Sequence, residues 1–154
     1  MVVICIFFSY YEFKSFLNLE KEEALQFIIS NTTEAGIEFV ETDLPTMQPP
    51  ASFPAKLAIL LHERFLHFKG DFTKGVTIIP CELINYNAAT LKNILLQYCD
   101  LWNLDAAFVK WVSEDCTYHS TLVDRIVPGY PRAEIEDYNN KLDYQDNLIV
   151  AAEP

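Results

Sequence analysis

Residues 76–87 read VTIIPCELINYN, and this stretch decides the fold. Residues 76–79 form a short apolar run rich in β-branched side chains, which is typical of a buried central strand. Pro80 ends the run, because proline has no N–H to donate to a sheet. After a polar loop, Asn87 can cap a helix, whose apolar face is made of Leu91, Ile94, Leu95 and Tyr98. A strand, a loop and a helix in this order form one unit of a parallel α/β sheet.

The sequence upstream of this unit repeats the same order of elements. Residues 25–30 are apolar and aromatic and predict another buried strand, which the polar loop 31–36 follows. The prolines of the stretch 43–54 exclude both a helix and a central strand there. A helix is predicted between Ser52, a suitable N-cap, and Gly70, a suitable stop. Its apolar stripe is made of Leu57, Leu60, Leu61, Phe65 and Phe68.

Strand-like and helix-like segments alternate along the rest of the chain as well. This alternation predicts an α/β fold in which helices cross over between parallel strands. The other predicted elements are a buried strand at 2–8, a helix within 11–19, a helix at 105–112, an extended segment at 121–127, a turn at 128–131 and an acidic helix at 133–144.

Composition and charge exclude several classes of protein. The chain has 154 residues, the size of one domain, and a hydrophobic share of 51% with a charged share of 21% excludes a disordered chain. A net charge of −11 argues against nucleic-acid and anionic-lipid partners. The apolar run at 2–8 is too short to span a membrane. The 4 glycines are scattered and cannot build a phosphate-cradling loop.

Two polar loops lie where chemistry is expected in a parallel sheet, at the carboxyl ends of predicted strands. The loop at 30–36 offers hydroxyl groups and a carboxylate, and the loop at 80–87 offers Cys81, Glu82 and two asparagines. These residue types suit a binding or catalytic site, but they also suit ordinary capping and turn chemistry. Both hypotheses remain open from the residues alone.

The remaining reactive residues support weaker hypotheses. Cysteines 5, 81, 99 and 116 form no C-x-x-C pair and follow no cleavable signal, so we expect reduced thiols in a cytoplasmic protein. Cys81, Cys116 and His119 could be drawn as a metal site, but their wide spacing argues against it, and we expect no metal. Cys81 as a nucleophile would need a distant histidine. Asp124 and Arg125 stand in an apolar run, where a charge is either paired or supports a site.

Four motifs occur together in the order and at the spacing of one known family. They are SNTTEAG at 30–36, FPAKL at 53–57, IIPCELI at 78–84 with Asn87, and STLVDRIV at 120–127 with GYPR at 129–132. Together they closely resemble the mannitol dehydrogenase family of long-chain polyol dehydrogenases, and among its members the tagaturonate reductases. The resemblance covers roughly residues 10–153. Residues 1–9 match poorly, so the strand at 2–8 is predicted from its pattern alone.

The resemblance implies a partial Rossmann-type domain, the second half of an NAD-binding sheet with its crossover helices. It also implies a metal-independent, NAD-dependent hydride transfer between D-tagaturonate and D-altronate, with a small hexuronate as the substrate. By the same resemblance, Thr32, Thr33 and Glu34 lie beside the dinucleotide. The loop that ends at Asn87 faces the reacting carbon, and Asp124 supports the site from behind.

Two positions depart from the wider family. Polyol dehydrogenases at large have Cys-Asp-Asn in the second loop, where the asparagine helps to bind the substrate oxygen. This chain has Cys81-Glu82-Leu83, and the leucine cannot donate that hydrogen bond. Tagaturonate reductases resemble Cys-Glu-Leu here, so the departure favours the uronate branch. Ala88 replaces the family's usual glycine and is expected to tighten the turn.

The resemblance also implies segments that this chain lacks. The family's glycine-rich loop would precede residue 1, and its catalytic lysine, in a C-terminal domain, would follow residue 154. We therefore expect a fragment, 1–154, of the N-terminal domain that binds NADH poorly and has no turnover alone. Two alternatives stay open: a non-catalytic acidic interaction module that self-associates through uncovered apolar edges, and a sister enzyme, fructuronate reductase or mannitol dehydrogenase, which Glu82-Leu83 disfavours.

Overall fold

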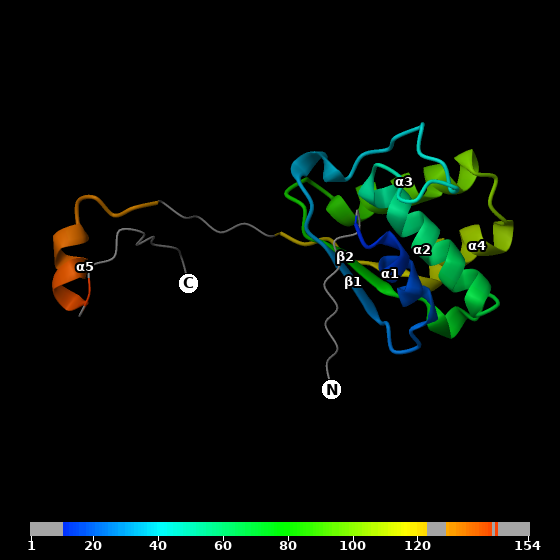
Figure 1. Ribbon diagram of the computed structural model, residues 1–154, viewed down its shortest axis with the longest axis horizontal. Helices are drawn as coiled ribbons and strands as arrows, with labels where there is room; N and C mark the ends of the chain where they lie inside the picture. Colours follow the sequence, from blue (N-terminus) through cyan, green and yellow to red (C-terminus); the bar gives the residue numbers. More distant parts are fainter. Residues whose placement is uncertain (1–10, 123–128, 143, 145–154) are drawn as a thin grey trace. The chain divides into compact units, whose positions relative to one another are not determined.

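The computed structural model describes residues 11–122, 129–142 and 144, whose elements are shown in Figure 1. The chain divides after Leu122 into two compact units, which are described separately. The described part of the second unit contains α5 (Ile135–Lys141), a shorter helix than the one predicted at 133–144. The predicted strand at 2–8 and the part of the extended segment from residue 123 onward lie outside the described residues.

A parallel sheet is the framework of the first unit. Its strands lie in the order β1 (Phe27–Ser30), β2 (Thr77–Pro80) and β3 (Thr117–Tyr118), and Ser30 is paired with Pro80. β2 is the central strand among the described residues, as its apolar run predicts. Parallel neighbours need long connections, and helices supply them here, which confirms the predicted α/β crossover architecture.

The helix α2 (Phe53–His67) begins and ends as the sequence predicts. The Ser52 hydroxyl accepts a hydrogen bond from the N–H of Ala55 at 3.2 Å, which satisfies one of the free donors of the first turn. After the helix, Gly70 adopts a φ of +74°, a left-handed conformation that glycine takes without strain. Its N–H donates to the carbonyl of Phe65 at 2.9 Å and closes the end of the helix.

The helix α3 (Asn87–Leu101) carries the predicted apolar face, but its start differs from the prediction. Asn87 is the first helical residue and not the N-cap. Tyr86 holds the cap position with a left-handed φ of 55°, and its side chain makes no capping bond. The prediction is wrong here because the Asn87 side chain is engaged elsewhere in the structure, as described below.

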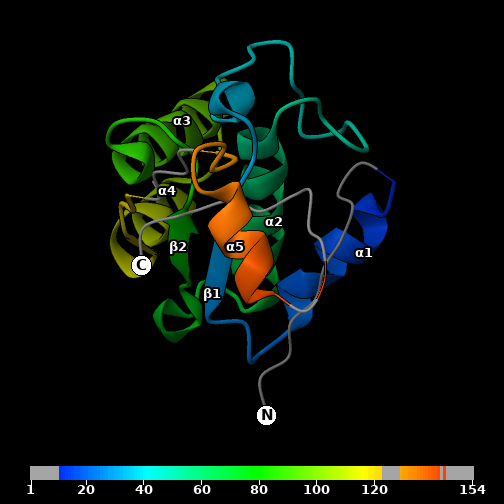
Figure 2. The same cartoon turned by 90° about the vertical axis from the view of Figure 1, so that its left-hand side faces the viewer.

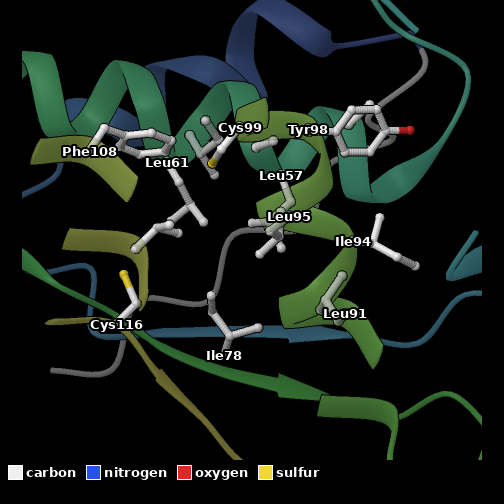
Figure 3. Packing of buried hydrophobic residues seen from close by; sticks show 14 of the residues in the cluster. Leu57, Leu61, Ile78, Leu91, Ile94, Leu95, Tyr98, Cys99, Phe108 and Cys116 are labelled. Carbon is white, nitrogen blue, oxygen red and sulfur yellow. The ribbon is translucent and has the colours of Figure 1, made fainter. Parts of the chain in front are cut away.

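The hydrophobic core lies between these two helices and one face of the sheet. Figure 3 shows Ile78 of β2 pointing toward Leu91 and Leu95 of α3, with Leu57 and Leu61 of α2 above them. All of these side chains are at most 1% exposed. At about 25 cal/mol per Å² of buried apolar surface, this packing is the main source of stability.

The opposite face of β1 is not covered by the described residues. Phe27 is 58% exposed and Ile29 is 68% exposed, whereas Ser30 is buried. The prediction of a fully buried strand is therefore wrong for β1. The reason is that α2 and α3 both pack on the other face, so that alternate side chains of the strand remain in contact with solvent.

The smaller elements largely follow their predicted positions. The helix α1 (Phe13–Leu17) lies against α2 (Figures 1 and 2), and it continues as a 3-10 turn through Lys21. The helix α4 (Ala106–Lys110) begins at the cap Asp105, and a π-helical turn at Trp111–Asp115 follows it. None of the helices in the described ranges is long and apolar enough to cross a membrane.

Arg64 is a buried cation near the end of α2. It is 1% exposed, and its guanidinium donates to the backbone carbonyls of Lys74 at 2.9 Å, Glu20 at 3.1 Å, Glu22 at 2.8 Å and Leu25 at 3.3 Å. Burial lowers the pKa of Arg64 from its ordinary value, although nearby Cys116 and Glu22 oppose the shift. One side chain thus connects α2 to the segment before β1 and to the turn before β2.

Candidate functional site

The strands end at one edge of the sheet, and polar residues follow each of them. The N–H of Cys81 donates to the carbonyl of Ser30 at 2.7 Å, which continues the β1–β2 pairing into the loop. On the other side, the N–H of His119 donates to the carbonyl of Ile78 at 3.0 Å. The two polar loops predicted from the sequence therefore meet at the carboxyl edge of the sheet, where α/β proteins bind ligands.

Glu82 joins these two loops. It is 1% exposed, and its carboxylate accepts hydrogen bonds from the Ser30 hydroxyl at 3.0 Å, the Thr32 N–H at 3.0 Å and the Thr32 hydroxyl at 2.9 Å. A buried carboxylate is tolerated only when donors surround it, and these donors come from the loop after β1. The residues that follow β1 and those that follow β2 thus form one hydrogen-bonded unit.

Asn87 ties the end of β2 to the segment after β3. Its Nδ2 lies 3.0 Å from the carbonyl oxygen of Pro80, 3.2 Å from that of Glu82 and 3.2 Å from that of Thr121. Its Oδ1 accepts from the N–H of Ala88 at 2.8 Å and from that of Thr121 at 3.3 Å. The fully buried amide is engaged by backbone on both sides. The supporting role of Asn87 in catalysis remains a prediction. In the structure, the Asn87 amide holds the loop after β2 through these hydrogen bonds.

The residues predicted beside the dinucleotide have different surroundings. Thr32 is half-buried against the carboxylate just described, whereas Thr33 is exposed. Glu34 begins a single 3-10 turn that ends at Gly36, and its side chain lies outside the described part of the structure. The close packing of the turn explains the glycine at position 36, because a Cβ there would overlap the Thr32 side chain. The predicted role of these residues toward a cofactor stays a prediction.

A pocket of about 400 Å³ opens beside this loop, and Thr32, Gly36 and Lys56 are among the residues that line it. Lys56 is buried, and its Nζ donates to the carbonyl of Ala51 at 3.1 Å. Burial lowers the pKa of Lys56, although the negative charge of Asp43 opposes this shift. The lining also includes Glu38, so the pocket offers an ammonium group, hydroxyl groups and a carboxylate beside apolar walls, which suit the ribose hydroxyls of part of a dinucleotide. Lys56 lies inside the FPAKL motif but was not predicted as a site residue.

Asp43 holds the chain at the rim of this pocket, and it was also missed. Its carboxylate accepts from the N–H of Ala51 at 2.7 Å and from that of Ser52 at 2.9 Å, and the Tyr98 hydroxyl lies 3.4 Å away. Burial by itself would raise the pKa of Asp43, but the hydrogen bonds outweigh it and hold the pKa below its ordinary value. Asp43 therefore fixes the entry into α2.

Changing Asp43 to Asn is expected to destabilise the chain by about 1–3 kcal/mol at neutral pH, because an amide NH₂ would face a backbone N–H. Since folding lowers the pKa of Asp43, its contribution is present above the unfolded-state pKa and is lost as pH falls through the folded-state pKa. Urea unfolding at neutral and acidic pH should show that the difference in unfolding free energy between the parent and Asp43→Asn becomes smaller as the pH falls. The exposed Glu41→Gln is the control, and an equal difference at both pH values would contradict the prediction.

Within the described residues, the other reactive side chains form no cluster of His, Cys, Asp and Glu that could hold a metal ion. Burial raises the pKa of the Cys99 and Cys116 thiols to about 11, so both are protonated at neutral pH. Cys81 is half-buried, and its thiol lies 3.8 Å from the carbonyl of Ile79. Asp124 and Arg125 lie outside the described residues, so the alternatives proposed for them stay open.

Curated relatives share this chain's sequence over nearly its whole length. It is 49% identical over 144 residues to the altronate oxidoreductase of Yersinia enterocolitica, covering 94% of this chain and 30% of the relative. It is 50% identical over 138 residues to the altronate oxidoreductase of Bacteroides thetaiotaomicron, covering 90% of this chain and 29% of the relative. The chain thus spans about 30% of the length of the curated relatives it matches.

Two solved structures have the same fold. Mannitol 2-dehydrogenase of Pseudomonas fluorescens, solved with NAD and D-mannitol, superposes with a TM-score of 0.59 at 17% identity, covering 94% of this chain and 31% of that one. A D-sorbitol dehydrogenase, in substrate-free form, superposes with a TM-score of 0.60 at 20% identity, with the same coverage of 94% and 31%. These likenesses support a partial Rossmann-type α/β fold. The model of the mannitol dehydrogenase Rossmann domain matches residues 10–154, and the chain belongs to this family.

Proposed function

We propose that this chain is the second half of the NAD-binding domain of a tagaturonate reductase, also called altronate oxidoreductase. The observation that carries the proposal is the identity of 49% to an altronate oxidoreductase over 94% of the chain. The position of Cys81-Glu82-Leu83 in the joined loops supports the proposal, since α/β proteins bind ligands at the carboxyl edge of the sheet. The proposal includes NAD as the cofactor, a small hexuronate as the substrate, a cytoplasmic location, and no nucleic-acid or membrane partner.

In the proposed reaction, the carbinol carbon of D-altronate loses a hydride and its hydroxyl loses a proton, which gives D-tagaturonate, NADH and H⁺. NAD, when bound, supplies the acceptor for the hydride. The residues of this chain bind and orient: Thr32, Thr33 and Glu34 on the cofactor side, and Lys56 in the adjoining pocket. Asn87 and Asp124 act as supporting groups, and the group that moves the proton is expected in the remainder of the enzyme.

The proposal is tested by a graft. Residues 10–154 of this chain replace the matching segment of the Yersinia enterocolitica altronate oxidoreductase, and NADH oxidation is followed with tagaturonate, fructuronate and fructose. We expect the graft to oxidise NADH with tagaturonate in preference to the other two, and the isolated chain to show no turnover. A folded graft that prefers fructuronate or fructose would contradict the assignment, and turnover by the isolated chain would contradict its role as a segment.

The uncovered face of β1 favours a second candidate function, a non-catalytic module that pairs with a second copy of itself. Phe27 and Ile29 are exposed on β1, which is an edge strand of the sheet formed by the described residues, and exposed apolar side chains at a sheet edge promote association. Under this alternative, the mass of the isolated chain in light scattering should rise with concentration. Ile29→Glu should return it to the monomer of 17.7 kDa, whereas Leu66→Glu, on exposed α2 surface, should not. A monomer at every concentration would count against the module.

A further inference from the structure

Glu82 is buried, and its carboxylate is stabilised by neutral donors of the neighbouring loop. Within residues 11–122, no lysine, arginine or histidine nitrogen forms an ion pair with its carboxylate. Its stabilisation comes instead from Ser30 and Thr32, which donate the bonds at 2.9–3.0 Å described above. Both donors belong to the loop predicted beside the cofactor, whereas Glu82 itself belongs to the loop predicted beside the substrate.

The two loops are held in different ways. The Asn87 amide anchors the loop 81–86 to the end of β2 and to Thr121. In contrast, Thr32 of the loop after β1 and Ser30 at the end of β1 are held on the neighbouring loop through Glu82. Loosening this bridge should therefore displace the loop after β1 more than the loop after β2.

We propose that Glu82 is a positioning residue that sets the cofactor-side loop against the substrate-side loop, and that the length of its side chain carries this role. The proposal rests on the proposed reductase function. Glu82 is 1% exposed, so its effect on the pocket beside α2 would pass through Thr32, which lines that pocket. The structure assigns the two carboxylate oxygens to different partners, Oε1 to Thr32 and Oε2 to Ser30.

This division allows length and charge to be separated. In Glu82→Gln, the remaining carbonyl oxygen can accept both bonds from Thr32, and the new NH₂ can donate to the Ser30 hydroxyl, which is able to accept. The variant loses the charge but keeps the bridge. In Glu82→Asp, the charge remains, but the side chain is one methylene shorter and cannot reach both partners. Glu41→Asp is the matched control, because it shortens an exposed carboxylate on the same unit.

Amide hydrogen exchange in the isolated chain tests the bridge without any activity. The N–H of Thr32 donates to Glu82, so its exchange reports this contact directly. We expect the Thr32 amide to exchange at the parent rate in Glu82→Gln and in Glu41→Asp. In Glu82→Asp, we expect it to exchange up to about tenfold faster. Equal Thr32 exchange in the parent and in Glu82→Asp would overturn the proposal.

Kinetics of the graft test the consequence. Glu82→Asp should lower kcat/KM for NADH on the order of 100-fold, mostly through KM, and should change the KM for tagaturonate little. A merely destabilised enzyme would instead lose kcat at an unchanged KM. Glu82→Gln should keep the KM for NADH at the value of the parent graft. An equal rise of this KM in Glu82→Gln and Glu82→Asp would overturn the role of side-chain length. An inactive parent graft would contradict the proposed function, whereas exchange at Thr32 would still decide the bridge.

Discussion

Replacing Arg64 by methionine is expected to lower the free energy of unfolding by about 3–5 kcal/mol. Methionine fills a similar volume but donates nothing to the carbonyls of Lys74, Glu20, Glu22 and Leu25. Replacing both partners of a buried polar contact by apolar groups costs little stability. Here the acceptors are backbone carbonyls, which stay in place and would be left buried without a donor. Since a small domain is stable by only about 5–15 kcal/mol, this loss would remove a large share of the chain's stability.

Urea unfolding followed by circular dichroism measures this loss. Lys110→Met is the matched control, because Lys110 is exposed and its 3.9 Å contact with Glu114 should contribute less than about 1 kcal/mol. Arg64→Lys should fall between the two, since an ammonium group keeps the charge but lacks the planar fork that reaches several carbonyls. A methionine variant as stable as the Lys110 control would show that water satisfies the carbonyls when Arg64 is removed.

The local signals of the sequence predicted the elements well, because caps and breakers act over a few neighbouring residues. Ser52, Gly70 and Pro80 each mark the boundary that they predict, and the apolar run at 76–79 identifies the central strand. The exposure of Phe27 and Ile29 could not be predicted in the same way. A continuous apolar run in a parallel strand is typical of burial on both faces, and whether the second face is covered depends on elements outside the strand.

The sequence predicts the two polar loops of the candidate site, but it does not predict the hydrogen bonds that join them through Glu82. Glu82 bonds to Thr32, which is 50 residues away, and Arg64 bonds to Glu20, which is 44 residues away. No periodicity or motif states such pairings. The Glu82–Thr32 contact arises because the parallel strands bring their carboxyl ends together, whereas the Arg64–Glu20 contact arises because α2 packs beside the segment that precedes β1. Asn87 shows the same limit: its residue type predicts a helix cap, but the crossing segment at Thr121 makes it a buried anchor.

Changing Asn87 to Asp is expected to destabilise the first unit by about 3–5 kcal/mol at neutral pH. Aspartate has nearly the same shape, but the group that replaces Nδ2 would be a carboxylate oxygen facing the carbonyl oxygens of Pro80, Glu82 and Thr121. Burial and these neighbours disfavour the charge, so the introduced carboxyl should have a raised pKa in the folded state. A protonated carboxyl can donate again, which gives the variant a pH dependence of its own.

The sign of that dependence follows from the raised folded-state pKa. The stability gap between Asn87→Asp and the parent chain should be smallest below the ordinary pKa range of aspartate, and it should widen as pH rises through the folded-state pKa. Unfolding curves in urea at several pH values measure the gap. Asn85→Asp is the control in the same loop, because Asn85 is exposed and should change stability by less than about 0.5 kcal/mol. Equal stability of the two variants would mean that the Asn87 amide does not hold the end of β2, and its supporting role in the proposed reductase would lose its structural basis.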